Sequence, residues 1–193
     1  MRISGGAARG VTLLVPKGDA VRPATDGLRQ AVFSSLAARV PGAIFLDLFA
    51  GSGAYGLEAL SRGASGGTFV EKNAKAAACL KQNIAAVCKS LKRDERGVKV
   101  LQGDVLEWTL GAVEAAPDLV FIDPPYEIIE AVAPKIFVRL GELLKTVNDP
   151  VVAFEMPGGL TLEPEGWTCV KRLGSGGVRQ PAVAFFRANR ALT

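Results

Sequence analysis

The chain has 193 residues, with 23 Lys and Arg, 19 Asp and Glu, and no His. Its length suits a single domain, and a composition that is 49% hydrophobic and 22% charged is typical of a globular protein rather than a disordered one. The absence of His excludes a Ser-His-Asp or Cys-His catalytic group, a His-ligated metal site and an imidazole proton shuttle, and we expect no metal.

The formal net charge of +4 lies entirely in residues 1–40, because residues 41–193 carry equal numbers of basic and acidic side chains. Residues 2–15 of this basic segment predict a β-hairpin, and residues 25–38 predict a short helix. A basic, glycine-rich segment attached to a neutral body is typical of an appendage that binds a polyanion. We therefore expect a nucleic-acid-binding extension over 1–40 and a separate body over 41–193.

The body predicts strands that alternate with helices. Short apolar runs predict strands at 44–48, 68–70, 98–101, 119–122 and 151–154, with a closing antiparallel pair at 167–171 and 182–186. Helices are expected at 54–62, 73–88 and 134–144, the last beginning at Pro134 because proline is unfavourable inside a helix. Repeated βα units with short connections indicate a doubly wound α/β sheet.

A glycine loop follows the first of these strands, with the sequence Gly51-Ser52-Gly53-Ala54-Tyr55-Gly56. Glu71 lies twenty residues after Gly51, at the end of the next strand, where an acid binds the ribose hydroxyls of a nucleoside cofactor. Asp47, at the end of the first strand, would repel the pyrophosphate of NAD but suits the cationic amino-acid end of S-adenosylmethionine. The pattern therefore favours S-adenosylmethionine.

A second motif, Asp123-Pro124-Pro125-Tyr126, directly follows the 119–122 strand at the sheet edge where the cofactor would bind. The Asp123 carboxylate and the Pro124 carbonyl could accept both hydrogens of an exocyclic base amine, which frees the lone pair of the nitrogen for methylation. The two prolines would fix this geometry in advance, and the Tyr126 ring could stack on an extruded base. We predict that these four residues are catalytic.

These motifs resemble those of a known family. The strings Asp47-Leu48-Phe49-Ala50-Gly51-Ser52-Gly53, Val70-Glu71-Lys72, Gly103-Asp104 and Asp123-Pro124-Pro125-Tyr126 are similar to those of class I amino-methyltransferases. The resemblance narrows to the bacterial 16S ribosomal RNA guanine-N2 methyltransferases of the RsmD family on the N-terminal strings Met1-Arg2-Ile3-Ser4-Gly5-Gly6, Arg9-Gly10, Arg22-Pro23-Ala24-Thr25-Asp26, Arg29 and Phe33-Ser34-Ser35-Leu36.

The resemblance implies a Rossmann-like seven-stranded sheet with a reversed last strand, and S-adenosylmethionine as the methyl donor. By the family pattern, the glycine loop holds the methionine part of the cofactor, Glu71 the ribose and Asp104 the adenine amine. The expected cofactor-binding residues are Asp47, Phe49, Ala50, Gly51, Ser52, Gly53, Glu71, Lys72 and Asp104. The implied substrate is the N2 amine of a guanine in 16S rRNA, within the small ribosomal subunit or its assembly intermediate.

The basic extension provides the expected RNA contacts, namely Arg2, Arg9, Arg22 and Arg29. Val11 and Gly27 stand where the family usually carries basic residues. The longest charge-free run in the sequence is ten residues, far short of the ~20 apolar residues that cross a bilayer. We expect a cytoplasmic monomer that makes no membrane contact.

Three other functions share part of this pattern. An amino-methyltransferase that acts on adenine or cytosine of another RNA or DNA would carry the same catalytic motif. If the protein were an NAD-dependent oxidoreductase, the Asp123–Tyr126 motif would be accidental. A non-catalytic RNA-binding assembly factor would not need the motif, so the presence of Asp123 and Tyr126 argues against that function. The short extension leaves little room for a domain that reads a DNA sequence.

Overall fold

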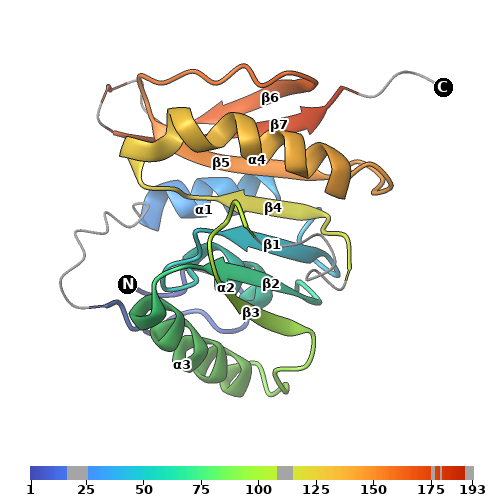
Figure 1. Ribbon diagram of the computed structural model, residues 1–193. Coiled ribbons are helices and arrows are strands. Elements are labelled where there is room, and N and C mark those ends of the chain that lie inside the picture. Colours follow the sequence, from blue (N-terminus) through green and yellow to red (C-terminus); the bar gives the residue numbers. More distant parts are fainter. Residues whose placement is uncertain (17–25, 108–114, 175–176, 179, 190–193) are drawn as a thin grey trace.

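In the part of the chain that the structure describes, seven strands form one sheet in the order β3-β2-β1-β4-β5-β7-β6 (Figure 1). The structure, a computed structural model, describes residues 1–16, 26–107, 115–174, 177–178 and 180–189. The strands are β1 (Ile44–Leu48), β2 (Gly66–Glu71), β3 (Val98–Gln102), β4 (Leu119–Ile122), β5 (Val151–Pro157), β6 (Trp167–Leu173) and β7 (Pro181–Ala188). Strand β7 runs antiparallel to both of its neighbours, which confirms the predicted sheet with a reversed last strand.

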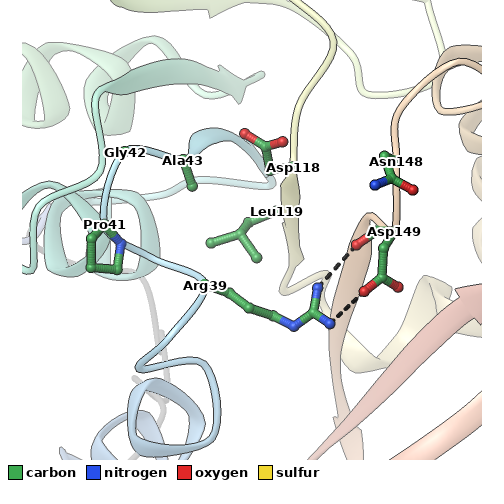
Figure 2. Close-up of a pocket in the computed structure, with 8 residues that line it drawn as sticks. All are labelled: Arg39, Pro41, Gly42, Ala43, Asp118, Leu119, Asn148 and Asp149. Atoms are coloured by element: carbon green, nitrogen blue, oxygen red, sulfur yellow. Dashed lines mark hydrogen bonds and ion pairs between the residues drawn. The ribbon is translucent and has the colours of Figure 1, made fainter.

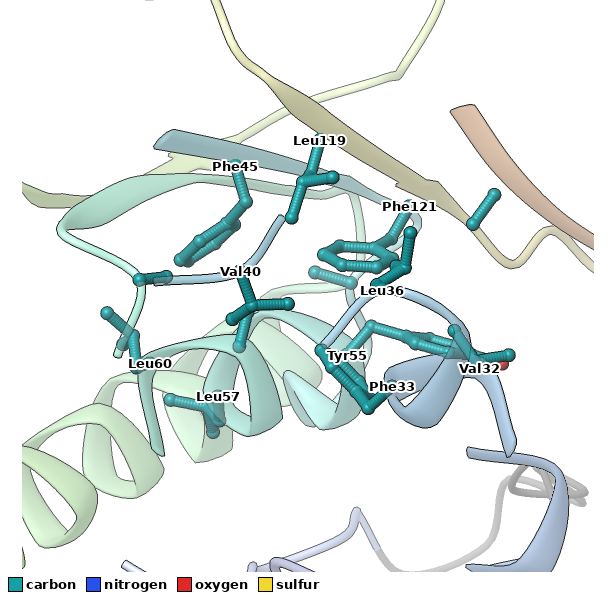
Figure 3. Close-up of a cluster of buried hydrophobic side chains, with 14 of the residues drawn as sticks. Val32, Phe33, Leu36, Val40, Phe45, Tyr55, Leu57, Leu60, Leu119 and Phe121 are labelled. Carbon is teal, nitrogen blue, oxygen red and sulfur yellow. The ribbon is translucent and has the colours of Figure 1, made fainter. Parts of the chain in front are cut away.

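Helices cover both faces of the sheet. Helices α1 (Asp26–Ser35), α2 (Ala54–Ser61) and α3 (Ala74–Ser90) pack on one face, and α4 (Ile129–Leu143) packs on the other. Successive strand residues point to opposite faces of the sheet. Phe45 and Phe121 therefore enter the cluster beneath α1 and α2, which Figure 3 shows. Their neighbours Leu46 and Val120 pack against α4. None of the described helices is long and apolar enough to cross a membrane.

Helix α4 corrects one prediction, because it begins at Ile129 and contains Pro134 in its interior. The proline lacks the N–H that would donate to the carbonyl of Glu130, a defect that costs about 3 kcal/mol. The apolar face of the helix is buried, however, and side chains such as Ile136 and Phe137 each contribute roughly 1.5–3 kcal/mol by burial. Burial of this face therefore outweighs the missing hydrogen bond.

The N-terminal extension packs into the body instead of standing apart from it. Its hairpin is reduced to one isolated antiparallel bridge, Arg2 with Thr12. The buried side chains of Ile3, Leu13 and Phe33 join the same hydrophobic cluster as the central strands. The expected appendage on a separate core is therefore wrong for the described part of the extension, which shares one core with the sheet.

A close backbone contact joins the extension to α2. The N–H of Ala7 donates to the carbonyl of Ser61 at 2.7 Å, and the Ser61 hydroxyl donates to the carbonyl of Gly5 at 2.6 Å. Gly6 has a φ of 78°, and a Cβ at this position would lie 1.9 Å from the Ser61 carbonyl oxygen. Only glycine allows this approach, so the Gly5-Gly6 pair is explained by packing.

Candidate active site

The structure brings the two predicted motifs together at one edge of the sheet. The glycine loop follows β1, Glu71 ends β2, Asp104 follows β3 and Asp123 follows β4, and these four strands are neighbours in the sheet. Backbone hydrogen bonds join the strand ends, since Ala50 N–H donates to the Val70 carbonyl at 3.0 Å. This carboxyl edge is where parallel α/β sheets bind their ligands.

The backbone enters the left-handed region at two positions of the glycine loop, Gly51 with a φ of 55° and Gly53 with a φ of 86°, and at Phe49, just before the loop, with a φ of 60°. A left-handed conformation is unusual for a residue such as Phe49, and backbone strain of this kind gathers at functional sites. A Cβ on Gly53 would lie 2.4 Å from Leu80, so this glycine lets α3 approach the loop. A Cβ on Gly51 would meet only the Phe49 carbonyl oxygen, at 4.0 Å, so the space above that residue is open.

The carboxylates of Glu71 and Asp104 flank this loop. Glu71 accepts hydrogen bonds from the N–H groups of Gly51, at 2.7 Å, and Asn73, at 2.6 Å. Lys72 donates to Asp104 at 2.8 Å, and this bond lowers the pKa of the Asp104 carboxyl. Carboxylate oxygens have several lone pairs, so both groups keep capacity to accept from hydroxyls or an amine. The donor and acceptor chemistry of this edge therefore fits a nucleoside.

Removing the Glu71 side chain tests this fit. We expect Glu71→Ala to weaken binding of S-adenosylmethionine by about 1–3 kcal/mol, because a charged acceptor is lost. Isothermal titration calorimetry measures the change. The control is Glu95→Ala, because Glu95 is exposed and precedes β3, at the end of that strand away from Asp104. Equal affinities of Glu71→Ala and the control would contradict a role of Glu71 in cofactor binding.

Asp47 lies beneath the glycine loop. Its side chain is only 2% exposed and accepts a hydrogen bond from the Gly56 N–H, in the first turn of α2, at 2.9 Å. Burial raises the pKa of the Asp47 carboxyl to about 8, and the nearby charge of Glu71 adds to this rise. A cationic ligand above the loop would favour the ionised form of the Asp47 carboxyl. The pairing of Asp47 with the cationic end of the cofactor stays a prediction.

The second motif begins at the residue directly after β4. The Asp123 N–H donates to the carbonyl of Leu48 at 3.3 Å, which places the start of the motif beside the glycine loop. Pro124 is buried, Pro125 is exposed, and Tyr126 is half-buried at the start of a 3₁₀ turn, Tyr126–Ile128. Burial raises the pKa of Asp123 well above its usual range, and the charges of Glu155 and Asp47 add to this effect.

Two residues at this site were missed by the sequence analysis. Glu155 of β5 is 2% exposed, and its Oε2 atom accepts a hydrogen bond of 2.6 Å from the Tyr55 hydroxyl. The Tyr55 ring stacks on Phe121 at 5.4 Å between centroids, inside the cluster of Figure 3. The available signal was an acid that directly follows the apolar run Val151–Phe154, as Asp123 follows the preceding strand.

The four arginines predicted to contact RNA have different environments. Arg2 and Arg9 are exposed, and Arg22 lies outside the described residues. Arg29 is 1% exposed, donates to the carbonyl of Arg2 at 2.8 Å and lies 3.5 Å from the buried carboxylate of Glu58. The predicted phosphate contact is therefore wrong for Arg29, because its guanidinium is enclosed and serves an internal carboxylate.

A cavity of about 380 Å³ lies at the opposite edge of the sheet (Figure 2). Arg39 spans it and donates to the backbone carbonyl of Asp149 at 3.0 Å, while Asp118 and Leu119 line another wall. These residues lie at the amino ends of the strands, about 16 Å from the glycine loop across the five residues of β1. The cavity is therefore separate from the candidate active site.

The amino-acid sequence is similar to those of known proteins over most of its length. Residues 1–181 match the family model described as Conserved hypothetical protein 95. The chain is 34% identical over 181 residues to the ribosomal RNA small subunit methyltransferase D of Escherichia coli (strain K12), a match that covers 87% of this chain and 81% of that protein.

Two solved structures show the same fold. The hypothetical protein TTHA0928 of Thermus thermophilus is 32% identical, with a TM-score of 0.74 over 96% of this chain and 98% of that one. The protein SMU.776, solved in complex with SAH, shares the fold at 14% identity, with a TM-score of 0.60 over 82% of this chain and 49% of that one. The resemblance predicted from the motifs is confirmed: the chain belongs to the Conserved hypothetical protein 95 family, that of the ribosomal RNA small subunit methyltransferase D proteins.

Proposed function

We propose that the protein is an S-adenosylmethionine-dependent methyltransferase that modifies the exocyclic N2 amine of a guanine in 16S rRNA. It acts as a monomer on the small ribosomal subunit or its assembly intermediate. The observation that carries this proposal is the Asp123–Tyr126 motif beside a strained glycine loop, in a chain 34% identical to a ribosomal RNA small subunit methyltransferase.

The residues at the carboxyl edge divide the work of holding the cofactor. The glycine loop holds the methionine part above Asp47, Glu71 accepts from the ribose hydroxyls, and Asp104 accepts from the adenine amine. Phe49, Ala50, Ser52, Gly53 and Lys72 complete this group by shaping the loop and orienting Asp104. When bound, S-adenosylmethionine supplies an electrophilic methyl group, and the chain's own residues prepare the nucleophile.

That preparation takes place at the second motif. Asp123 and the Pro124 carbonyl accept the two amine hydrogens, which draws the nitrogen toward a pyramidal geometry and frees its lone pair. Pro125 has a φ of −52°, typical of proline, so the turn needs little reorganisation when the base enters. The half-buried Tyr126 ring stacks on the extruded base.

A transfer assay tests the proposed function. Small ribosomal subunits and their assembly intermediates, isolated from cells that lack the gene, are each incubated with the purified protein and methyl-labelled S-adenosylmethionine, and the RNA is digested to nucleosides. We expect the label in N2-methylguanosine. Label in a methylated adenosine or cytidine would support the alternative substrates, and an absence of label in subunits and assembly intermediates would overturn the proposed activity.

Arg2 and Arg9 are the exposed members of the predicted RNA contacts. Each phosphate contact contributes about 0.7 to the log–log salt dependence of binding on single strands and about 0.9 on duplexes. We therefore expect Arg2→Gln combined with Arg9→Gln to lower the slope by about 1.5 in filter-binding titrations with rRNA. The control is Arg96→Gln, an exposed residue that precedes β3, and an equal slope in the double variant and wild type would contradict the prediction.

A further inference from the structure

The Asp123 carboxyl has a buried carboxyl as its neighbour in the sheet. Strands β4 and β5 are parallel, and their last paired residues are Ile122 and Phe154. Asp123 and Glu155 are the next residues, so they occupy adjacent positions on neighbouring strands, which lie about 4.8 Å apart. Ile122 and Phe154 point toward α4, so the alternation of side chains places both acids on the opposite face, toward α1 and α2.

Glu155 is held from the α2 side by Tyr55. The Tyr55 hydroxyl donates to Glu155 at 2.6 Å, and its ring is fixed between Phe121 and Phe33, with centroids 5.4 Å and 6.4 Å away. Glu155 is 2% exposed and Tyr55 is 4% exposed, so water does not substitute for this hydrogen bond. Burying a carboxyl next to a second carboxyl is energetically costly, and titratable groups in such costly surroundings cluster at functional sites.

The charged groups around this pair favour one ionised carboxyl. Burial raises the pKa of Glu155 to about 7, against the lowering effects of the Tyr55 hydrogen bond and the positive charge of Arg29 on α1. Asp123 faces the negative charges of Glu155 and of Asp47 on β1, and burial raises its pKa further. Two adjacent carboxyls in such surroundings do not both ionise easily, which favours a single proton shared between them.

We propose that Glu155, oriented by the Tyr55 hydroxyl, is a positioning residue that shares one proton and one negative charge with Asp123 beside the substrate amine. This inference rests on the proposed function, in which Asp123 accepts one of the two amine hydrogens. The pair then acts as the base. The nitrogen lone pair forms the N–C bond, the S–C bond breaks with its electrons left on sulfur, and the cationic nitrogen loses a proton to the pair, whose charge changes from −1 to 0.

This arrangement predicts how the pH dependence responds to Glu155→Gln. In the wild type, the rate requires the first ionisation of the pair, which Tyr55 and Arg29 direct to Glu155, so the acid limb of the pH–rate profile lies near pH 7. In Glu155→Gln, Asp123 must ionise alone. Without the negative charge of Glu155, the pKa of Asp123 falls. The acid limb of the pH–rate profile then reports this single Asp123 pKa, which lies above the wild-type limb, so the Asp123 titration and the acid limb give the same value.

Two measurements test this inference. Carbon-13 NMR of protein labelled at the aspartate carboxyls follows the titration of Asp123, with Asp123→Asn used to assign its signal. Single-turnover methyl transfer, at saturating cofactor, gives the pH–rate profile. We expect Glu155→Gln to lower the Asp123 pKa, raise the acid limb and reduce the rate at pH 7 about tenfold, with an unchanged Kd for the cofactor. Glu165→Gln, an exposed control, should change none of these.

The outcomes separate this inference from the proposed function. An unchanged Asp123 titration in Glu155→Gln overturns the inference, and this result needs no RNA substrate. A wild-type protein without methyl transfer overturns the proposed function, while the NMR titration still tests the shared proton. If Glu155→Gln does not fold, Tyr55→Phe takes its place: loss of the hydrogen bond should raise the Glu155 pKa and move the acid limb upward, and an unmoved limb overturns the inference.

Discussion

Replacing Asp123 with Ala is expected to reduce methyl transfer about 10²-fold or more, while affinity for S-adenosylmethionine stays nearly unchanged. The loss appears in turnover because Asp123 acts on the substrate amine, and removal of one preorganised hydrogen-bonding group commonly has this size. Single-turnover transfer to small subunits measures the rate, and calorimetry measures cofactor affinity.

A measurement of thermal stability distinguishes a loss of catalysis in Asp123→Ala from unfolding of the variant. The ionised form of Asp123 is disfavoured by burial and by neighbouring negative charges, so Ala removes no favourable ion pair. We expect thermal unfolding of Asp123→Ala at pH 8 to occur at the wild-type temperature or above it. The control is Asp94→Ala, an exposed acid that pairs with Arg96 before β3. Turnover of Asp123→Ala within about threefold of the control would contradict the catalytic role.

Replacing Arg29 with Ala is expected to destabilise the protein by about 3 kcal/mol, because it leaves a buried carboxylate without one of its cations. Glu58 is fully buried and lies 3.5 Å from Arg29 and 2.8 Å from Arg62. Ser4 adds a hydroxyl hydrogen bond of 2.7 Å to the same carboxylate, so one acid joins the extension, α1 and α2.

Urea unfolding measures this effect, with Arg2→Ala as the control because its side chain is exposed. The control should change the free energy of unfolding by less than about 0.5 kcal/mol and weaken RNA binding. Arg29→Ala should show the reverse pattern, with lost stability and an unchanged salt slope for the fraction that remains folded. Wild-type stability with weakened RNA binding would restore the phosphate contact first predicted for Arg29.

Local patterns predicted most of the framework. The apolar runs gave β1 and β4 with their observed bounds, 44–48 and 119–122, because buried parallel strands are nearly continuous in hydrophobicity. The reversed last strand followed from the family resemblance, whereas the strand order was not predicted, since no periodicity reports which strands pair. The predicted start of α4 was wrong because the unfavourable effect of a proline inside a helix can be seen in the sequence. The burial of Ile136 and Phe137, which compensates for it, depends on the tertiary fold.

The candidate site divides in the same way. The glycine loop and the Asp123–Tyr126 motif were visible because each is contiguous in sequence and follows a strand. Glu155 directly follows an apolar run, as Asp123 does, but its partner Tyr55 is 100 residues away and meets it only in the fold, so the sequence does not report their hydrogen bond. Arg29 was misread because a count of charges does not report burial, and the internal carboxylate that it serves, Glu58, lies on another helix.

The most direct test of the central claim is a map of methylated bases in small-subunit rRNA from cells with and without the gene. Mass spectrometry of RNA fragments should show one guanine that loses its N2-methyl group when the gene is deleted. Expression of the wild-type chain should restore that group, and expression of Asp123→Ala at an equal level should not. An identical methylation map in both cells, or a lost methyl group on an adenine or cytosine, would contradict the account.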